Sequence, residues 1–120
     1  MSKYVDGFLL PLDPTRLDRY REIATEAGRI WKEHGALAYF ECVGDDMRIE
    51  NMVSFLDAAA TRDNETAIFA WIVFESREHR DRVNAAVMAD PRMNAMMGPD
   101  EDVFDYKRMA YGGFRVLVEA

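Results

Sequence analysis

The feature that most constrains the fold is the uncharged run TAIFAWIVF at residues 66–74. Its β-branched and aromatic residues favour a strand, in which side chains alternate between two faces. Here both faces are apolar, with Phe69, Trp71 and Val73 on one and Ile68, Ile72 and Phe74 on the other. A helix layer can cover one face. A chain of 120 residues has little left for the second, so we expect a partner chain to cover it.

Three further strands are expected around this central one. Residues 4–10 are aromatic and branched, and Pro11 is expected to end that strand. A second strand is expected over 37–43 and a last one over 107–118, where Gly112-Gly113 is typical of a bulge. Residues 54–60 fit either a short strand or a helical turn, and the pattern does not decide between them.

Two helices are expected between the strands. Asp13 as N-cap with Pro14 at the first position begins the first, and Gly35 suits its left-handed C-terminal cap. Ser76 is the expected N-cap of the second, which ends before Asp90-Pro91. The order β-α-β-(β)-β-α-β predicts a single domain over 1–120. It is an α+β, ferredoxin-like βαββαβ protomer, whose antiparallel sheet carries two helices on one face. Two such sheets face to face would form a dimeric α/β barrel.

Composition excludes several classes of partner. The net charge of −7 argues against nucleic acid and against an anionic membrane surface. No uncharged apolar run approaches the ~20 residues of a membrane-spanning helix. The start of the chain, MSKYVDGFLLPLD, does not fit a signal peptide. Because Cys42 is the single cysteine, no intrachain disulfide is possible, and a cytoplasmic location is the default expectation.

The sequence has no strong catalytic or cofactor motif. It lacks a glycine-rich phosphate loop, a zinc-protease motif, a cysteine pair and a GxSxG motif. His34 is expected at the end of the first helix, His79 on the surface of the second, and Cys42 as an inert side chain on a strand. Asp45-Asp46 are expected in a solvated turn. We therefore expect no metal and no cofactor, haem and flavin included.

The best catalytic candidates are carboxylates on strand faces that are otherwise apolar. Asp6 shares a face with Tyr4 and Phe8, and Glu41 shares one with Tyr39. Burial would raise the pKa of such a carboxyl unless a cation pairs with it, which suits a general acid or base. The alternative is structural: Asp6 and Glu41 would pair with arginines at a dimer interface, or reach the barrel mouth.

Four side chains are candidates for binding a small-molecule ligand: Trp71, Tyr39, Met109 and Tyr111. They would meet the two carboxylates, and Lys107 with them, only if the faces of their strands coincide. A methionine cluster over 88–97 fits an adaptable binding groove or an ordinary core edge. The loop that follows, with Gly98-Pro99, could close over one end of the barrel.

Several runs resemble one family of proteins. YVDGFLLP, IWKEHGALAYFECVGDD, FAWIVFESREHRD, VMADPRM and KRMAYGGF are similar to the YbaA-like family of small uncharacterised bacterial proteins, over about residues 4–118. The resemblance implies a dimeric α/β barrel with a ferredoxin-like protomer. That superfamily also holds cofactor-free monooxygenases, lactone isomerases, stress-responsive proteins and haem-dependent relatives. Their sites lie between sheet and helices or inside the barrel, and no catalytic residue set transfers to this chain.

Two functional hypotheses follow from these observations. In the first, the dimer holds a cavity that binds or transforms a small organic molecule, in the manner of a cofactor-free monooxygenase or isomerase. In the second, the chain is a non-catalytic homodimer, structural or stress-related, whose internal polar groups only set the register of the interface.

Overall fold

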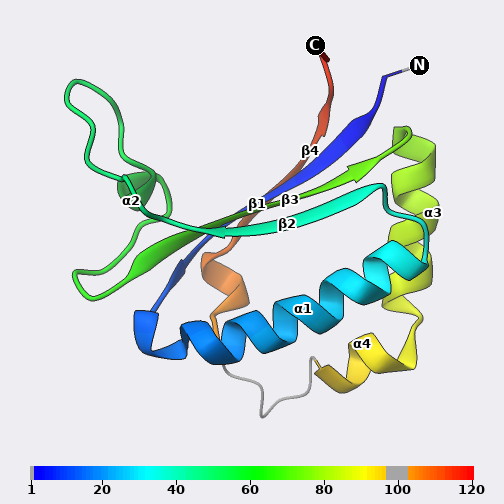
Figure 1. Ribbon diagram of the computed structural model, residues 1–120, viewed down its shortest axis with the longest axis horizontal. Coiled ribbons are helices and arrows are strands. Elements are labelled where there is room, and N and C mark those ends of the chain that lie inside the picture. Colours follow the sequence, from blue (N-terminus) through cyan, green and yellow to red (C-terminus); the bar gives the residue numbers. More distant parts are fainter. Residues whose placement is uncertain (1, 97–102) are drawn as a thin grey trace.

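The computed structural model describes residues 2–96 and 103–120 and shows a four-stranded antiparallel sheet with helices on one side (Figure 1). The sheet order is β2-β3-β1-β4. The elements follow the chain as β1 (Tyr4–Leu12), η1 (Pro14–Arg16), α1 (Leu17–Glu33), β2 (Ala38–Val43), α2 (Phe55–Ala58), β3 (Thr66–Phe74), α3 (Arg77–Met88), α4 (Pro91–Met96), η2 (Tyr106–Arg108) and β4 (Ala110–Arg115). The α+β class and the antiparallel sheet predicted from the sequence are confirmed.

Strand β3 occupies the bounds predicted for it and lies inside the sheet. It pairs with β1 along its whole length, with Leu9 opposite Phe69, and with β2, where Phe40 lies opposite Trp71. Figure 1 shows α1, α3 and α4 on the same side of this sheet, and α2 in the long connection between β2 and β3. No helix among the described residues is long and apolar enough to cross a membrane.

The helix-covered face of the sheet contains the core. On β3 the side chains of Ile68, Ile72 and Phe74 are buried there, and Phe74 is completely inaccessible. Ile30 of α1 and Val87 of α3 pack in the same clusters and are also fully buried. Burial of these apolar side chains between sheet and helices is the main force that holds the protomer together.

The opposite face of the sheet is apolar and largely exposed in the described part of the protomer, where Phe55 of α2 contacts only its margin at Phe69. Phe40 stacks on Trp71 with ring centroids 5.0 Å apart, and Phe69 lies 5.4 Å from Trp71 on its other side. Phe40, Phe69 and Phe114 are 50%, 44% and 62% exposed. We call this surface the open face; it consists of the outward side chains of Phe40, Phe69, Trp71, Val73 and Phe114. A contiguous aromatic surface of this kind is typical of an interaction site.

The first helix ends as predicted, but it begins a few residues later than predicted. The carboxylate of Asp13 accepts a hydrogen bond from the backbone N–H of Thr15 at 3.0 Å, but it caps the short turn η1, and α1 begins after it at Leu17. Gly35 has φ +117°, a conformation that favours glycine. The backbone N–H of Ala36 donates to the carbonyl of Trp31 and completes this C-terminal cap.

Strand β1 does not stop before Pro11, as the sequence had suggested. Pro11 pairs with Ala67, and the carbonyl of Ala67 accepts from Gly44 on the β2 side. The nitrogen of Pro11 therefore points away from β3, toward the edge where β4 pairs only as far as Leu9. A proline costs no ladder hydrogen bond at such a position.

The last strand is shorter and more regular than predicted. Lys107 lies in η2 rather than in a strand, and the pairing of β4 with β1 runs without a bulge through Gly112 and Gly113. The expected bulge is wrong, and Gly113 makes room for a side chain instead. A Cβ on Gly113 would lie 2.5 Å from the hydroxyl of Tyr4.

The two undecided segments are helical. Residues 54–60 contain the single turn α2, which Ser54 caps by accepting from the backbone N–H of Leu56. Of the methionine cluster, Met88 ends α3, and Met93 and Met96 lie in the short helix α4, where Met93 is buried in the core. Met97 lies outside the described residues. Gly98-Pro99 lie outside the described residues.

Candidate functional site

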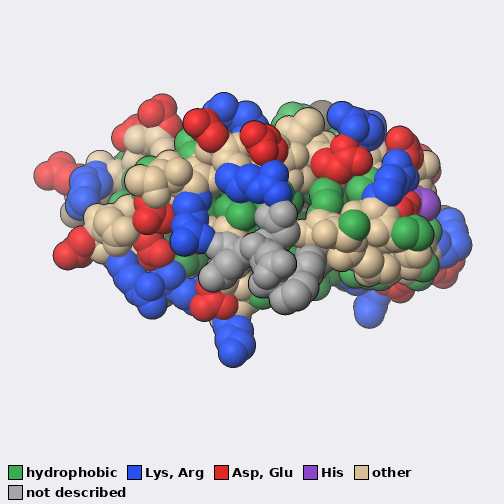
Figure 2. Space-filling view, turned by 90° about the horizontal axis from the view of Figure 1, so that it is seen from below, with side chains coloured by type: hydrophobic (Ala, Val, Ile, Leu, Met, Phe, Trp, Pro, Cys, Tyr) green, Lys and Arg blue, Asp and Glu red, His purple; other side chains and the backbone are tan. Residues whose placement is uncertain are grey.

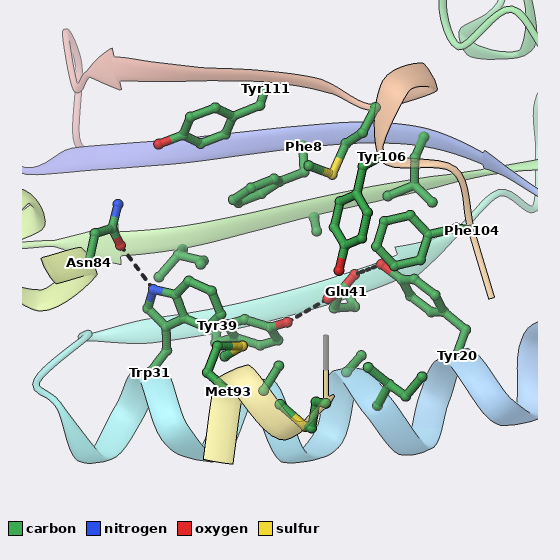
Figure 3. A pocket seen from close by; sticks show the side chains of 18 of the residues that line it. Phe8, Tyr20, Trp31, Tyr39, Glu41, Asn84, Met93, Phe104, Tyr106 and Tyr111 are labelled. Atoms are coloured by element: carbon green, nitrogen blue, oxygen red, sulfur yellow. Dashed lines mark hydrogen bonds between the residues drawn. The ribbon is translucent and has the colours of Figure 1, made fainter. Parts of the chain in front are cut away.

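A cavity of about 400 Å³ lies between the sheet and the helices (Figure 3). Its walls come from β1, β2, β3, β4 and from α1, α3, α4 and η2. The lining residues are Phe8, Leu10, Tyr20, Ile23, Ala24, Ala27, Trp31, Tyr39, Glu41, Ala70, Ile72, Asn84, Met88, Met93, Met96, Phe104, Tyr106, Met109 and Tyr111. This volume is within the range of small-molecule sites, ~300–1,000 Å³.

The hollow exists because small side chains face each other across it. Helix α1 turns Ala24 and Ala27 toward the sheet, and β3 presents Ala70 at the facing position. Protein interiors are otherwise packed as densely as organic crystals. A space left open in the middle of the core is therefore a specific feature of this sequence.

Among the described residues that line the cavity, Glu41 is the only one with a formally charged side chain. Its carboxylate accepts hydrogen bonds from two phenols, Tyr20 at 2.6 Å and Tyr39 at 2.5 Å. Figure 3 shows the carboxylate between the two hydroxyl groups, one from α1 and one from its own strand. The same three side chains also line a groove on the outer side, between α1 and the edge strand β2. Glu41 therefore lies in the wall between the cavity and the surface.

Burial dominates the protonation of this group. It raises the pKa of the Glu41 carboxyl, and the hydrogen bonds from Tyr20 and Tyr39 oppose that rise. Burial and the neighbouring carboxylate in turn raise the pKa of both phenols, so Tyr20 and Tyr39 stay neutral donors. A carboxyl whose pKa is raised by burial in an apolar cavity holds its proton to a higher pH than an exposed glutamate does, which suits a general acid or base.

Gly28 of α1 makes the position of Tyr39 possible. A Cβ at Gly28 would lie 2.7 Å from Cδ1 of the Tyr39 ring, well inside van der Waals contact. A glycine in the middle of a helix costs about 1 kcal/mol relative to alanine. Here the absence of a side chain at Gly28 allows the Tyr39 ring to lie against the helix, so that its hydroxyl reaches Glu41.

Asp6 is placed differently from Glu41. It is 1% exposed and pairs with Arg80 of α3, whose Nη1 lies 3.1 Å from its Oδ1. Asn84 donates to its other oxygen at 3.2 Å and accepts from Nε1 of Trp31 at 3.0 Å. Burial raises the pKa of Asp6, while Asn84 and the Arg80 charge oppose the rise. Asp6 is thus enclosed in a hydrogen-bonded network beside the cavity and is not among the lining residues.

The structure brings some of the predicted site residues together and separates one. Glu41, Tyr39, Met109 and Tyr111 all line the cavity, and Tyr111 stacks on Phe8 with centroids 4.9 Å apart. Trp71 lies on the open face of the sheet, because it alternates with the cavity residues Ala70 and Ile72.

Sequence reasoning did not identify Tyr20, Asn84 and Arg80 as site residues. Tyr20 lies on the apolar stripe of α1, and a hydroxyl within such a stripe was the available signal that a buried polar partner exists. Asn84 and Arg80 lie on α3, far along the chain from Asp6, and no local pattern connects them with it.

The histidines and the cysteine lie away from the cavity lining. Nε2 of His34 is 2.8 Å from Asp90 at the start of α4. Nδ1 of His79 accepts from the backbone N–H of Glu75. Cys42 is half-buried as a free thiol. Within residues 2–96 and 103–120, no group of three or more His, Cys, Asp or Glu side chains could hold a metal ion.

Two comparisons with known sequences agree on the family of this chain. The profile of the family described as "Protein of unknown function (DUF1428)" matches residues 3–108. The chain is 39% identical over 117 residues to "Uncharacterized protein YbaA" of Escherichia coli (strain K12), with 98% of each chain covered. The YbaA protein of Shigella flexneri matches equally well.

Comparison with solved structures shows the same fold in more distant proteins. A NIPSNAP family protein with unknown function from Agrobacterium tumefaciens has a TM-score of 0.58 at 17% identity, over 96% of this chain and 88% of that one. An uncharacterised NIPSNAP domain protein from Burkholderia xenovorans has a TM-score of 0.55 at 12% identity, over 98% and 94%. At these identities the likeness concerns the fold alone.

The contact between Gly28 and Tyr39 predicts that Gly28→Ala changes the free energy of unfolding in opposite directions in the presence and absence of the Tyr39 ring. In the wild-type background Gly28→Ala should lower the free energy of unfolding, because the new methyl group displaces the Tyr39 ring from Glu41. In a Tyr39→Ala background the same change should raise it by about 1 kcal/mol, the ordinary gain in a helix. Urea unfolding of the four proteins measures both effects. Stabilisation by Gly28→Ala in both backgrounds would rule out the contact.

The raised pKa of Glu41 predicts a pH-dependent gain in stability for Glu41→Gln. A carboxyl whose pKa rises on folding from its ordinary value of 4.5 binds protons more tightly in the folded state. Folding stability then falls as pH rises from 4.5 through the folded-state pKa. Glutamine does not titrate, so the advantage of the variant over wild type should be smallest near pH 4.5 and grow as the pH rises through the folded-state pKa of Glu41. Urea unfolding across this range measures it.

The matched control for this experiment is Glu22→Gln, which removes an exposed glutamate of α1. Its stability difference from wild type should show no comparable growth with pH. A Glu41→Gln advantage that shrinks as pH rises would mean that the folded state favours the ionised carboxylate, against the assignment made above.

Proposed function

The chain belongs to the DUF1428 family of proteins of unknown function, and we propose that it binds a small, largely apolar organic molecule in the cavity between its sheet and helices. Glu41 is the group that meets the polar part of that molecule. Tyr20 and Tyr39 hold the carboxyl in place by donating to it, and the surrounding aromatic and methionine side chains bind the apolar part. An apolar hollow with a few convergent polar groups is the usual form of a small-molecule site.

One observation carries this proposal: the carboxyl of Glu41 lies in the wall of an apolar cavity, with two neutral phenols as its hydrogen-bond partners. Asp6 shows how this fold neutralises a buried carboxylate for structural purposes, with an arginine 3.1 Å away. Glu41 has no such ion pair among the described residues. Burying a charge without a counter-charge costs stability, and groups retained at such a cost are often functional.

The same group would also serve a reaction. Isomerase-like and cofactor-free monooxygenase-like reactions both begin when a base removes a proton from the substrate. Glu41 is the lining residue able to accept that proton and to return it, and its hydrogen bonds fix the carboxyl in one orientation. Catalysis is therefore the extension of the binding proposal, with Glu41 as the acid–base group.

We further propose that two chains pair through their open faces. The aromatic surface of Phe40, Trp71 and Phe69 is continuous, and among the described residues Phe55 of α2 packs against Phe69 while Phe40 and Phe69 remain about half exposed. The strand order β4-β1-β3-β2 is that of a ferredoxin-like protomer, and pairing two such sheets face to face gives a dimeric α/β barrel. The cavity lies on the other side of each sheet, so each protomer keeps its own.

The alternative proposal is a non-catalytic homodimer in which buried polar groups only fix the register of the interface. The placement of the two carboxylates weakens it. Asp6 bonds to Arg80 of α3 and Glu41 to Tyr20 of α1, both on the helix side. A partner on the open face would contact neither group, so a register role does not explain them.

Filling the cavity should abolish ligand binding and leave the fold intact. Ala70→Leu adds bulk at the centre of the hollow, and filling a void commonly raises stability by about 0.5–2 kcal/mol. Fluorescence titration with the neutral probe N-phenyl-naphthylamine should show one site per chain in the wild type. In the variant we expect at least about tenfold weaker binding, a loss of ~1.4 kcal/mol.

The control for this titration is Ala85→Leu, at an exposed position of α3, which should bind the probe as the wild type does. Equal binding by wild type and Ala70→Leu would place the probe elsewhere and contradict the proposal. Native mass spectrometry of protein purified from its own host complements the titration, since a constant extra mass per chain identifies the natural ligand.

A substitution that places a charge on the open face tests the proposed dimer. We expect the wild type to sediment at twice the 13.8 kDa chain mass and Phe69→Glu to sediment as a folded monomer, because a buried unpaired carboxylate opposes association. Ala85→Glu places the same charge on the helix side and should stay dimeric. A monomeric wild type at micromolar concentration would exclude this pairing.

A further inference from the structure

The described wall of the cavity carries negative charge and no formal positive charge. Nineteen described residues line it, and they include one carboxylate and no lysine, arginine or histidine. Seven of the nineteen are aromatic: Phe8, Tyr20, Trp31, Tyr39, Phe104, Tyr106 and Tyr111. The faces of aromatic rings carry negative partial charge and attract cations. Every strong electrostatic feature of this wall therefore favours positive charge on a ligand.

The two carboxylates near the cavity differ in how they are compensated. Asp6 has its cation within the protein, because Arg80 pairs with it and also donates to the hydroxyl of Tyr111 at 2.9 Å. Glu41 receives only phenol hydrogen bonds among the described contacts. Two hydrogen bonds leave further lone pairs on the carboxylate unused. A ligand cation would supply the counter-charge that the protein provides for Asp6 and not for Glu41.

Farther from Glu41, the polar groups of Trp31, Asn84 and Tyr111 are already hydrogen-bonded within the protein. There Nε1 of Trp31 donates to Asn84, and Asn84 donates to Asp6, so these groups already bond to one another. Figure 3 shows this pair apart from Glu41, with the Trp31 ring and Met93 between α1 and the sheet. The site thus has one polar end at Glu41 and an apolar body.

We propose that the natural ligand of this cavity is an apolar organic amine, bound as its ammonium cation with Glu41 as counter-ion. The inference rests on the binding function proposed above and specifies the chemical class of the ligand. The ammonium N–H groups donate to the carboxylate, the rings of Tyr20, Tyr39 and Phe104 surround the charge, and the hydrocarbon part extends toward Trp31. An anionic ligand would meet Glu41 without any cation in the described wall to offset the repulsion.

The surface of the molecule does not select for anions either. Seen from the helix side, acidic and basic side chains are interspersed and no large basic patch is visible (Figure 2). The net charge of −7 attracts cations toward the protein as a whole. Surface and cavity therefore favour the same sign of ligand.

The test compares three probes with one ring system: naphthylmethylamine, naphthylmethanol and naphthoic acid. At neutral pH they are a cation, a neutral alcohol and an anion of similar size. Isothermal titration of the full-length wild type should give about tenfold or more tighter binding for the amine than for the alcohol, the usual gain of a charge-assisted hydrogen bond. The carboxylate should bind most weakly.

The variant Glu41→Gln distinguishes the effect of the carboxylate charge from the effect of the cavity's shape. It should remove the preference for the amine and leave the affinity for the alcohol nearly unchanged. Glu22→Gln removes an equal charge from the exposed side of α1 and should keep the preference, which excludes a general attraction to an acidic surface. Ala70→Leu should weaken all three probes, because it occupies the site itself.

The outcomes distinguish the two proposals. Equal binding of amine and alcohol, or tightest binding of the carboxylate, would overturn the amine assignment and leave the cavity as a binding site. An amine preference that persists in Glu41→Gln would overturn the role of Glu41 as counter-ion. Failure of all three probes to bind the wild type would overturn both proposals.

Discussion

The structure depends on one constraint, that strand β3 is apolar on both faces and must be covered twice. The helices satisfy this on one side only, where Phe74 and Ile72 are buried against α1 and α3. On the other side Phe40, Trp71 and Phe69 form a continuous aromatic surface with large exposed fractions. The two faces of the sheet therefore differ in what they contribute. The helix side contains the core and the cavity, and the open side is available for association, so a partner need not disturb the site.

Much of the fold could be predicted because local signals and the overall arrangement agree. The bounds of β3, the N-cap Ser76 and the cap at Gly35 follow directly from residue types. The errors arose where a long-range contact changed the meaning of a local signal. Pro11 normally ends a strand, but here its nitrogen faces an open edge. Gly112-Gly113 looked like a bulge, but the pairing is regular and Gly113 leaves space for the ring of Tyr4, which no local pattern reveals.

The candidate site shows the same limit more sharply. Asp6 and Glu41 look alike in the sequence, each a carboxylate on an apolar strand face. The structure gives them different surroundings, and residues far along the chain decide it: Arg80 from α3 reaches Asp6 and no cation reaches Glu41 in the described part of the chain. Alternation predicts which face a residue occupies, and it identified Glu41, Tyr39 and Tyr111. It does not predict which helix side chain crosses to meet them, so Tyr20 and Asn84 emerged only from the structure.

Three departures from ordinary packing coincide at Glu41, and their coincidence is the strongest argument for a site. The core is left hollow where Ala24, Ala27 and Ala70 face one another. Helix α1 carries Gly28, unfavourable in a helix, so that Tyr39 can lie against it. A carboxyl is buried without a cation, which lowers stability at neutral pH. Each departure alone has a structural explanation. Together they keep one cavity open and one carboxyl directed at it, and local sacrifices of stability of this kind are characteristic of functional sites.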